Sequence, residues 1–591
     1  MMKKRAVVVL IIILMPLAII GQYQIKDSKR LNAFEQIPKE TTFIQYNDGL
    51  LVAGEYLYYK MYCLNASNLT PSSVSKIGYV ELIGPDKNSV FTHKIQLIDG
   101  VGQGDFFIPA TITTGNYKLI GYTRWMENKT NQSYFASDIT IVNPFQELST
   151  PSTKNPDLLK VIDTSSMKEK MSTAKVEDIE IQLPKKTFQK RELVSLRVLI
   201  SNKTSKGSYA LSVRKIYSLS NVTRQSAFDF AVSDNRKVNF RKFMVNDTVS
   251  LPELRGELVS GKLISTRDGN PVADKDIILS IPGKPNVLRL TKTDESGVFY
   301  FLVDEPSRAS KAIIQTLGVN EEEIQTIPSK DSQVDYSAFE FESLQLREAV
   351  NSVILERSTY GQIENAYREQ KYDSFITHDT VLPVYQNLTE NYILDDYTRF
   401  RSLKETVVEV IPDLLLKKIK GIYKFQVRIN DNFFVEKVKN PLVIVDGVFL
   451  QDMDKLLNFD QKKIERISIG RNQYYIGPKM YQGIVEVATK KNDFWNTSNL
   501  KGTSTYDINA PLTKKLYYKQ TYTTNKQSNE GAQRIPDFRN QLVWEPNLEL
   551  IGAESNITFY TSDNSGTYEI ILEGFTNAGK AISANMYFTV E

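Results

Sequence analysis

Short apolar segments separated by turn-forming residues follow one another from about residue 42 to residue 143. Residues 56–62 are rich in tyrosine and other β-forming residues, and residues 77–83 and 117–123 alternate between apolar and polar positions. Asn47-Asp48-Gly49 and Gly84-Pro85-Asp86 between them are turn formers. Strands at this spacing, with no helical stretch, predict a β-sandwich over residues 24–145.

The remaining chain divides by the same criteria. Residues 146–175 have poor apolar periodicity and predict a linker, whereas the alternation in 194–200 and 208–213 predicts a second sandwich. The full expected order is a signal peptide at 1–22, a sandwich at 24–145, a linker at 146–175, a second sandwich at 176–250, a third at 251–305, a mixed connecting region with helices at 306–430, a small α+β domain at 431–495 and a C-terminal sandwich at 496–591. The predicted fold class is therefore mainly β, with serial immunoglobulin-like or macroglobulin-like sandwiches and one small α+β domain.

The N-terminus predicts export. Lys3, Lys4 and Arg5 precede an almost purely apolar run from Ala6 to Ile20. A basic start, an apolar run of about 15 residues and a small-residue exit are typical of a cleaved signal peptide. The alternative is an uncleaved anchor, although a spanning helix needs roughly 20 apolar residues. No transmembrane segment is expected after cleavage.

Composition argues against several classes of function. The net charge is +4 and the two signs are interspersed, which does not fit the concentrated basic surface of a nucleic-acid-binding protein. The chain has two histidines, His93 and His378, and one cysteine, Cys63, so no metal site of the zinc type, intramolecular disulfide or histidine-based triad is expected. No cofactor-binding or catalytic residues are predicted. A pair of carboxylates acting as a hydrolase remains an alternative, because any two can meet in three dimensions.

Two of the predicted sandwiches resemble known families. Ala53-Gly54-Glu55-Tyr56 together with Gly115-Asn116-Tyr117-Lys118-Leu119 resembles the macroglobulin-type domain of alpha-2-macroglobulin-like proteins, in the versions found in large exported proteins of Bacteroidetes. The Cys-Gly-Glu-Gln thioester of protease-trapping members is absent from this chain. Val259-Ser260-Gly261 with Asp294-Glu295-Ser296-Gly297 resembles the carboxypeptidase regulatory-like domain, a noncatalytic sandwich. We expect Asp294–Gly297 to form a hairpin turn after which Phe299 and Phe301 face one side.

The α+β unit at 431–495 resembles the plug domain of TonB-dependent receptors. The resemblance rests on Leu442-Val443-Ile444-Val445-Asp446-Gly447, on Ile464-Glu465-Arg466-Ile467, and on Gly483-Ile484-Val485-Glu486-Val487. We expect Asp446 and Gly447 to turn the chain after a buried strand. A receptor's barrel has roughly 22 strands and would need roughly 200 residues after the plug. Only 101 residues follow Lys490, so the resemblance does not extend to the transporter itself.

Bulky residues beside predicted turns are the candidate contacts for a partner: Trp125, Met126, Tyr474, Tyr475 and Trp544. Such residues are enriched where binding energy concentrates in interfaces. The alternative is that they pack in a core or between domains.

These observations lead to a noncatalytic binding or scaffold protein of the cell envelope, in the periplasm or associated with the outer membrane. The expected partners are envelope proteins, among them an outer-membrane β-barrel. The first alternative is an accessory of outer-membrane nutrient uptake that binds a ligand or a transporter, and the second is the carboxylate hydrolase.

Overall fold

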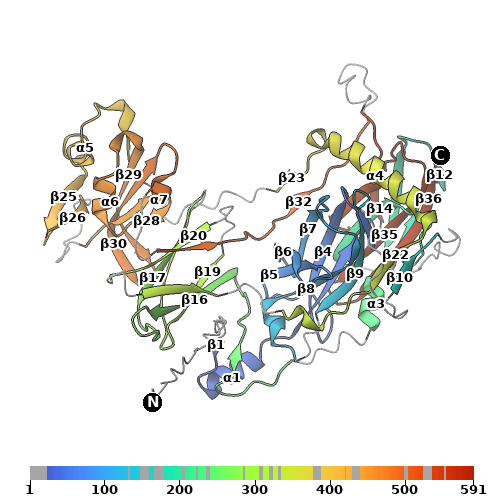
Figure 1. Cartoon of the computed structure of the whole chain (residues 1–591), viewed down its shortest axis with the longest axis horizontal. Coiled ribbons are helices and arrows are strands. Elements are labelled where there is room, and N and C mark those ends of the chain that lie inside the picture. Colours follow the sequence, from blue (N-terminus) through green and yellow to red (C-terminus); the bar gives the residue numbers. More distant parts are fainter. Residues whose placement is uncertain are drawn as a thin grey trace, which may run out of the picture.

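A computed structural model of the chain is mainly β, as the sequence predicted, and it forms two lobes (Figure 1). It describes residues 23–591 apart from 131–133, 147–158, 165–178, 201–205, 221–223, 234–239, 284–285, 305–310, 319–323, 330–333, 377–387, 420, 429–438, 498–502, 523–534 and 551–553. The predicted signal peptide and much of the predicted linker lie outside the described residues. Among the described residues, no helix is both long enough and apolar enough to cross a bilayer.

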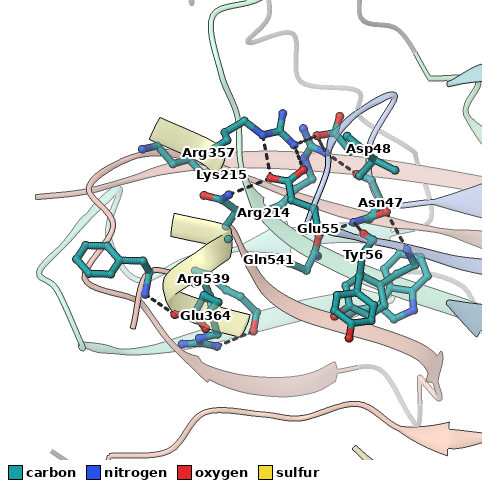
Figure 2. Close-up of a pocket in the computed structure, with 18 of the residues that line it drawn as sticks. Asn47, Asp48, Glu55, Tyr56, Arg214, Lys215, Arg357, Glu364, Arg539 and Gln541 are labelled. Carbon is teal, nitrogen blue, oxygen red and sulfur yellow. Dashed lines mark hydrogen bonds and ion pairs between the residues drawn. The ribbon is translucent and has the colours of Figure 1, made fainter. Parts of the chain in front are cut away.

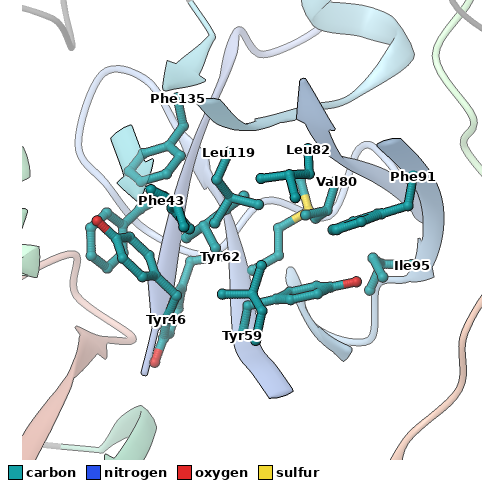
Figure 3. Packing of buried hydrophobic residues seen from close by; sticks show 14 of the residues in the cluster. Phe43, Tyr46, Tyr59, Tyr62, Val80, Leu82, Phe91, Ile95, Leu119 and Phe135 are labelled. Carbon is teal, nitrogen blue, oxygen red and sulfur yellow. The ribbon is translucent and has the colours of Figure 1, made fainter. Parts of the chain in front are cut away.

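The N-terminal module, residues 40–143, is a sandwich of two sheets. Its strands are β2 (Glu40–Tyr46), β3 (Leu50–Val52), β4 (Tyr56–Asn65), β5 (Ile77–Ile83), β6 (Ser89–Gln96), β7 (Val101–Phe107), β8 (Gly115–Tyr122) and β9 (Phe135–Val142). One sheet has the order β2-β4-β7 and the other β3-β9-β8-β5-β6. Figure 3 shows the core between them, in which Tyr59 lies beside Phe91 and Ile95.

The two sandwiches expected at 176–250 and 496–591 are a single sandwich in the structure. Its strands are β11 (Ile179–Gln182), β12 (Thr187–Phe188), β13 (Leu193–Ile200), β14 (Gly207–Lys215), β33 (Gln541–Leu548), β34 (Glu554–Tyr560), β35 (Gly566–Thr576) and β36 (Ala581–Val590). The sheets have the orders β11-β13-β34 and β12-β36-β35-β14-β33, so each contains strands from both segments. We call this unit the composite sandwich. Each segment supplies strands to both sheets and neither completes a sheet alone, so the apolar core forms only where the two segments pair.

The N-terminal module packs directly on the composite sandwich, and both faces of β4 are therefore buried. Lys60 of β4 is 1% exposed, and its Nζ donates to Ser208 Oγ at 2.8 Å and to the Tyr209 carbonyl at 3.0 Å. The Tyr62 hydroxyl donates to the Glu573 carbonyl at 3.3 Å. These contacts place β4 against β14 and β35 and join the two units into the first lobe.

The second lobe is inserted between the two segments of the composite sandwich. Its middle module contains β16 (Glu257–Ser265), β17 (Asp276–Ile281), β18 (Val287–Lys292), β19 (Val298–Val303), β20 (Lys311–Thr316), β21 (Ile324–Pro328) and β31 (Thr503–Asp507). Two sheets, β19-β16-β21 and β18-β17-β20-β31, bury Phe299 and Phe301 between them, as expected. The module extends beyond the predicted end at residue 305. The Asp294–Gly297 turn is no hairpin, because β18 and β19, which it connects, belong to different sheets.

The distal module, residues 390–497, is the α+β unit of the second lobe. It contains β24 (Glu390–Ile393), α5 (Leu403–Val410), β25 (Leu414–Ile419), β26 (Ile422–Val427), β27 (Leu442–Val445), β28 (Val448–Phe449), α6 (Met453–Leu457), β29 (Ile464–Ile476), β30 (Lys479–Thr489) and α7 (Phe494–Thr497). The main sheet has the order β24-β29-β30-β27-β28. Asp446 and Gly447 turn the chain with φ values of 47° and 81°, and the Asp446 carboxylate accepts from the Thr489 and Phe494 amides. The expected turn is confirmed, although the sheet begins 41 residues before the predicted boundary at 431, at Glu390.

The predicted connecting regions contribute to both lobes. Within the expected linker, β10 (Leu159–Ile162) pairs in parallel with β22 (Ser343–Leu346). Helix α4 (Asn351–Ala366) returns to the first lobe and packs on Leu50 and Val52. The described residues 250–256 and 508–514 run between the lobes, so the inserted lobe is tied to the first at more than one point (Figure 1).

Candidate functional site

A cleft of about 150 Å³ lies where the N-terminal module, the composite sandwich and helix α4 meet. The N-terminal module contributes the turn between β2 and β3 and the start of β4. The composite sandwich contributes β33 and the segment before it, and α4 forms one wall. Residues from positions 47 to 544 therefore line one site, and they are brought together by the return of the chain to the first lobe.

A buried ion cluster forms the charged wall of the cleft. Arg357 of α4 is 4% exposed, and its guanidinium donates to Glu55 at 2.6 and 3.0 Å and to Asp48 at 3.1 Å (Figure 2). Arg214 of β14 also pairs with Asp48. Burial alone would raise the pKa of Asp48, but Arg214 and Arg357 together lower it below its usual range. The cluster is therefore held in its ionised form and fastens α4 to both neighbouring units.

Another carboxylate that lines the cleft, Glu364, is also hydrogen-bonded within the protein. Its Oε2 accepts from Lys371 at 2.5 Å, and its Oε1 accepts from the Phe538 amide at 2.7 Å. Burial raises the pKa of Glu364, and Lys371 offsets part of that increase. Because both oxygens accept hydrogen bonds, Glu364 is not presented to a substrate as a proton donor.

Aromatic rings form the opposite wall. Tyr56 and Tyr58 are stacked with centroids 5.7 Å apart, and Tyr58 lies 6.1 Å from Trp544 at an interplanar angle of 26°. Tyr517 meets Tyr58 edge-on at 5.3 Å, and the Arg368 guanidinium lies 4.4 Å from the Tyr56 centroid. Alternation along β4 places Tyr56 and Tyr58 on one side of the strand, facing the cleft.

One polar group of the aromatic wall is the indole Nε1 of Trp544. It is buried, and among the described residues none accepts its hydrogen. A buried donor left without an acceptor costs about 1–3 kcal/mol. The cleft therefore combines ring faces, paired charges and an unsatisfied donor, which suits binding of a polar ligand better than chemistry. Among the described residues, no group of three or more His, Cys, Asp or Glu side chains is placed to hold a metal ion.

The structure buries three of the five predicted contact residues. Trp125 is 1% exposed, packs among Phe34, Phe240 and Phe243, and donates its Nε1 hydrogen to the Pro38 carbonyl at 3.1 Å. Met126 is fully buried in a separate cluster. Neither side chain is available to a partner, and packing, the alternative interpretation, describes both.

The other predicted residues have different surroundings. Trp544 is 4% exposed and contributes to the cleft wall rather than to an outer surface. Tyr474 is half-buried against the middle module, whereas Tyr475 is 67% exposed. The five residues thus do not form one surface, and Tyr475 alone among them has the exposure that a contact needs.

The ion cluster around Arg357 was not predicted from the sequence. Arg357 lies 302 residues from Glu55 and 309 from Asp48, and no local pattern links the three positions. The only available signal was the Gly54-Glu55 pair at the start of β4, where Gly54 adopts a φ of 96°. Asn365 of α4 donates to the Gly54 carbonyl at 2.8 Å, beside the ion cluster.

Comparisons with known proteins identify no family. No protein-family model and no curated protein sequence matches the chain. Among solved structures, Escherichia coli alpha-2-macroglobulin activated by porcine elastase is similar with 9% identity and a TM-score of 0.24, over 93% of this chain and 44% of that one. Trypsin-activated alpha-2-macroglobulin from Escherichia coli gives 9% and 0.23, over 96% and 43%. The Yersinia pseudotuberculosis adhesin InvE gives 10% and 0.12, over 49% and 57%.

This chain spans less than half the length of the two alpha-2-macroglobulins. TM-scores of this size do not establish a shared fold.

Proposed function

We propose that this chain is an exported, noncatalytic binding or scaffold protein of a bacterial cell envelope, which docks on outer-membrane or other envelope proteins. The observation that carries the proposal is the insertion of the second lobe into the composite sandwich. An inserted lobe with several connections is held at a more constant position than a domain at the end of a linker. Two lobes held in this way suit a protein that keeps partners at fixed relative positions.

The junction between the lobes supports this role. Lys94 of β6 pairs with Glu257 of β16 at 2.5 Å, and the side chains are 1% and 4% exposed. Arg124 donates to the Leu258 carbonyl at 2.7 Å, and Tyr79 donates to Glu253 at 3.1 Å. These buried polar contacts require a defined geometry, so they fix the angle between the N-terminal and middle modules.

Site-specific crosslinking in cells tests the proposal. A photoreactive phenylalanine analogue at Tyr475 is expected to capture an envelope protein, because this ring is 67% exposed on the second lobe. The same analogue at Leu193, which is 49% exposed on the composite sandwich, is the matched control. Recovery of no envelope protein through Tyr475, or equal recovery through Tyr475 and the Leu193 control, with the chain itself in the envelope fraction, would contradict a docking role for this surface.

A second candidate, an accessory of nutrient uptake that binds a ligand, is favoured by the unpaired indole hydrogen in the cleft. A ligand acceptor that reaches Trp544 would stabilise the folded protein in proportion to its binding. We expect a sugar, peptide or siderophore that uses this site to raise the melting temperature of the wild type more than that of Trp544→Phe, which keeps a ring and loses the donor. Equal shifts in both proteins would place the ligand elsewhere.

A further inference from the structure

The hairpin β25–β26 of the distal module carries an arrangement that is unfavourable for the isolated protein. Ile419 pairs across the strands with Ile422, and Lys417 pairs with Lys424. The two isoleucines are 50% and 55% exposed. Like charges directly opposite one another destabilise a sheet. Among the described residues, no carboxylate forms an ion pair with Lys417 or Lys424.

The two pairs lie on the same face of the hairpin. Side chains alternate along a strand, and cross-strand partners share a face, so the pair at 417 and 424 and the pair at 419 and 422 point the same way. The opposite face carries Leu414, Phe425 and Val427, which are buried in the core of the distal module. The apolar tip and the basic pair behind it therefore form one outward surface.

Further cations lie beside the tip on the opposite face of the hairpin. Tyr423 is next to the tip, and the Nζ atoms of Lys404 and Lys418 lie 4.0 and 5.3 Å from its ring centroid. Gly421 at the turn has a φ of 85° and open space where a side chain would lie. The hairpin lies at the end of the second lobe that is remote from the first lobe (Figure 1), so a large flat partner can approach it.

We propose that this hairpin docks the protein on an anionic phospholipid surface. The separation of its apolar and basic layers identifies the partner. The lysine pair lies two residues behind the isoleucine pair, or about 7 Å at the rise of a β-strand. Apolar side chains at a membrane interface penetrate about 5–10 Å, to the boundary between headgroups and acyl chains. With Ile419 and Ile422 at that boundary, Lys417 and Lys424 lie at the level of the lipid phosphates.

An acidic protein surface fits this arrangement less well. It would neutralise the lysines, but it would leave the isoleucine pair at the tip against polar groups. A bilayer supplies both an apolar layer and an anionic layer in the required order. Lys418 and Lys404 around Tyr423 fit the same interface, where amphipathic rings and long cationic side chains are favoured.

Cosedimentation of the purified full chain with lipid vesicles tests the proposal. We expect binding to vesicles of mixed zwitterionic and anionic phospholipid, weaker binding to purely zwitterionic vesicles, and a decrease with added salt. Lys417→Glu/Lys424→Glu should weaken binding to anionic vesicles about 30-fold or more, because each lysine near the surface contributes about a fivefold factor. Ile419→Ser/Ile422→Ser should weaken binding about tenfold or more through loss of apolar burial.

Matched controls separate these effects from general charge and hydrophobicity. Lys186→Glu/Lys190→Glu makes the same change in net charge at exposed positions of the composite sandwich, and Leu193→Ser removes an exposed apolar side chain there. Both controls should bind vesicles like the wild type, and circular dichroism should be unchanged in all variants.

Absence of wild-type binding to anionic vesicles would overturn the proposal, as would equal loss in the hairpin variants and their controls. Capture of an acidic protein through the hairpin, with no vesicle binding, would also overturn it. The assay contains only this chain and lipid, so its outcome is independent of whether the protein partner under Proposed function exists.

Discussion

The buried ion pair between the lobes gives a quantitative prediction. Glu257→Gln removes the charge that Lys94 pairs with at 2.5 Å, while both side chains stay 4% exposed or less. Removing one partner of a buried pair costs about 3–5 kcal/mol, because the remaining charge is left in a site of low polarity. Replacing both partners with apolar residues of similar size should cost much less. We therefore expect Glu257→Gln to destabilise the junction by about 3–5 kcal/mol and Lys94→Met/Glu257→Leu to recover most of that loss.

The three tryptophans allow the effect to be located. The chain contains Trp125 beside the junction, Trp495 in the distal module and Trp544 in the composite sandwich. In a Trp495→Phe/Trp544→Phe background, fluorescence reports the surroundings of Trp125 alone. Urea unfolding followed by this signal should show a lower midpoint for Glu257→Gln, with recovery in the double variant.

A change in the free energy of unfolding of less than about 1 kcal/mol for Glu257→Gln, the range of an exposed pair, would contradict a buried pair at the junction. Equal destabilisation of the single and double variants would also contradict it, because the ion pair would then not be the source of the loss. A matched control is Lys292→Met, which removes a pair whose side chains are 50% and 82% exposed. Lys292→Met should change the free energy of unfolding little.

Other predictions concern buried ionisable groups. Burial raises the pKa of Glu253 from 4.5 to about 7. The contribution of this group to folding stability is therefore fully present below pH 4.5 and is lost as the pH rises through 7. Glu253→Gln should remove about 3 kcal/mol of this pH dependence, measured from the urea midpoints at pH 4.5 and 8. Burial lowers the pKa of His93 from 6.5 to about 4, so folding stability is lost as the pH falls through that range. His93→Phe should therefore reduce the loss of stability at acid pH by up to about 3 kcal/mol. Identical pH profiles for variant and wild type would contradict either assignment. Arg357→Met removes the cation that pairs with Glu55 and leaves Asp48 with Arg214, so α4 should be released, measured as faster proteolysis within residues 351–366. Arg399→Met, at a more exposed pair, should have no such effect.

Local features of the fold were accessible from the sequence. The alternation around Tyr117–Tyr122 predicted a strand, and the Asp446-Gly447 turn occurs where it was expected. Phe299 and Phe301 share a buried face because strand periodicity alone determines this. These features are determined by residues close together in the chain, so they can be predicted from a single sequence.

The pairing of strands that are far apart in the chain could not be predicted from the sequence. Leu211 of β14 pairs with Leu572 of β35, and both segments carry the pattern of a strand with one buried face. That pattern indicates that a partner sheet exists but not which segment supplies it. The sequence therefore predicts two separate sandwiches where the structure has one. Trp125 and Met126 failed as contact candidates for a related reason. A bulky residue beside a turn has the same local signature whether it faces solvent or a neighbouring module.

The cleft could not be predicted from the sequence either, because it also depends on contacts between distant segments. Tyr56 and Tyr58 were visible as β-forming residues, but their common side faces the cleft because α4 and β33 return to cover it. The sequence does not indicate that Arg357 forms a buried ion pair, since a single arginine in a helix is usually solvated. Only the return of the chain to the first lobe makes it a buried partner for two carboxylates.

The pairing of β13 with β34 tests the composite sandwich and its inserted lobe most directly. Ser195 and Thr558 are cross-strand partners with exposed side chains, although more than half of the chain separates them. In a Cys63→Ala background, Ser195→Cys/Thr558→Cys should oxidise to a disulfide as readily as the local hairpin control Lys417→Cys/Lys424→Cys. Protease fragments cut within the inserted lobe should then stay linked until reduced. Free thiols at 195 and 558 under conditions that oxidise the control would contradict the composite sandwich, and with it the fixed arrangement of lobes on which the proposed scaffold role depends.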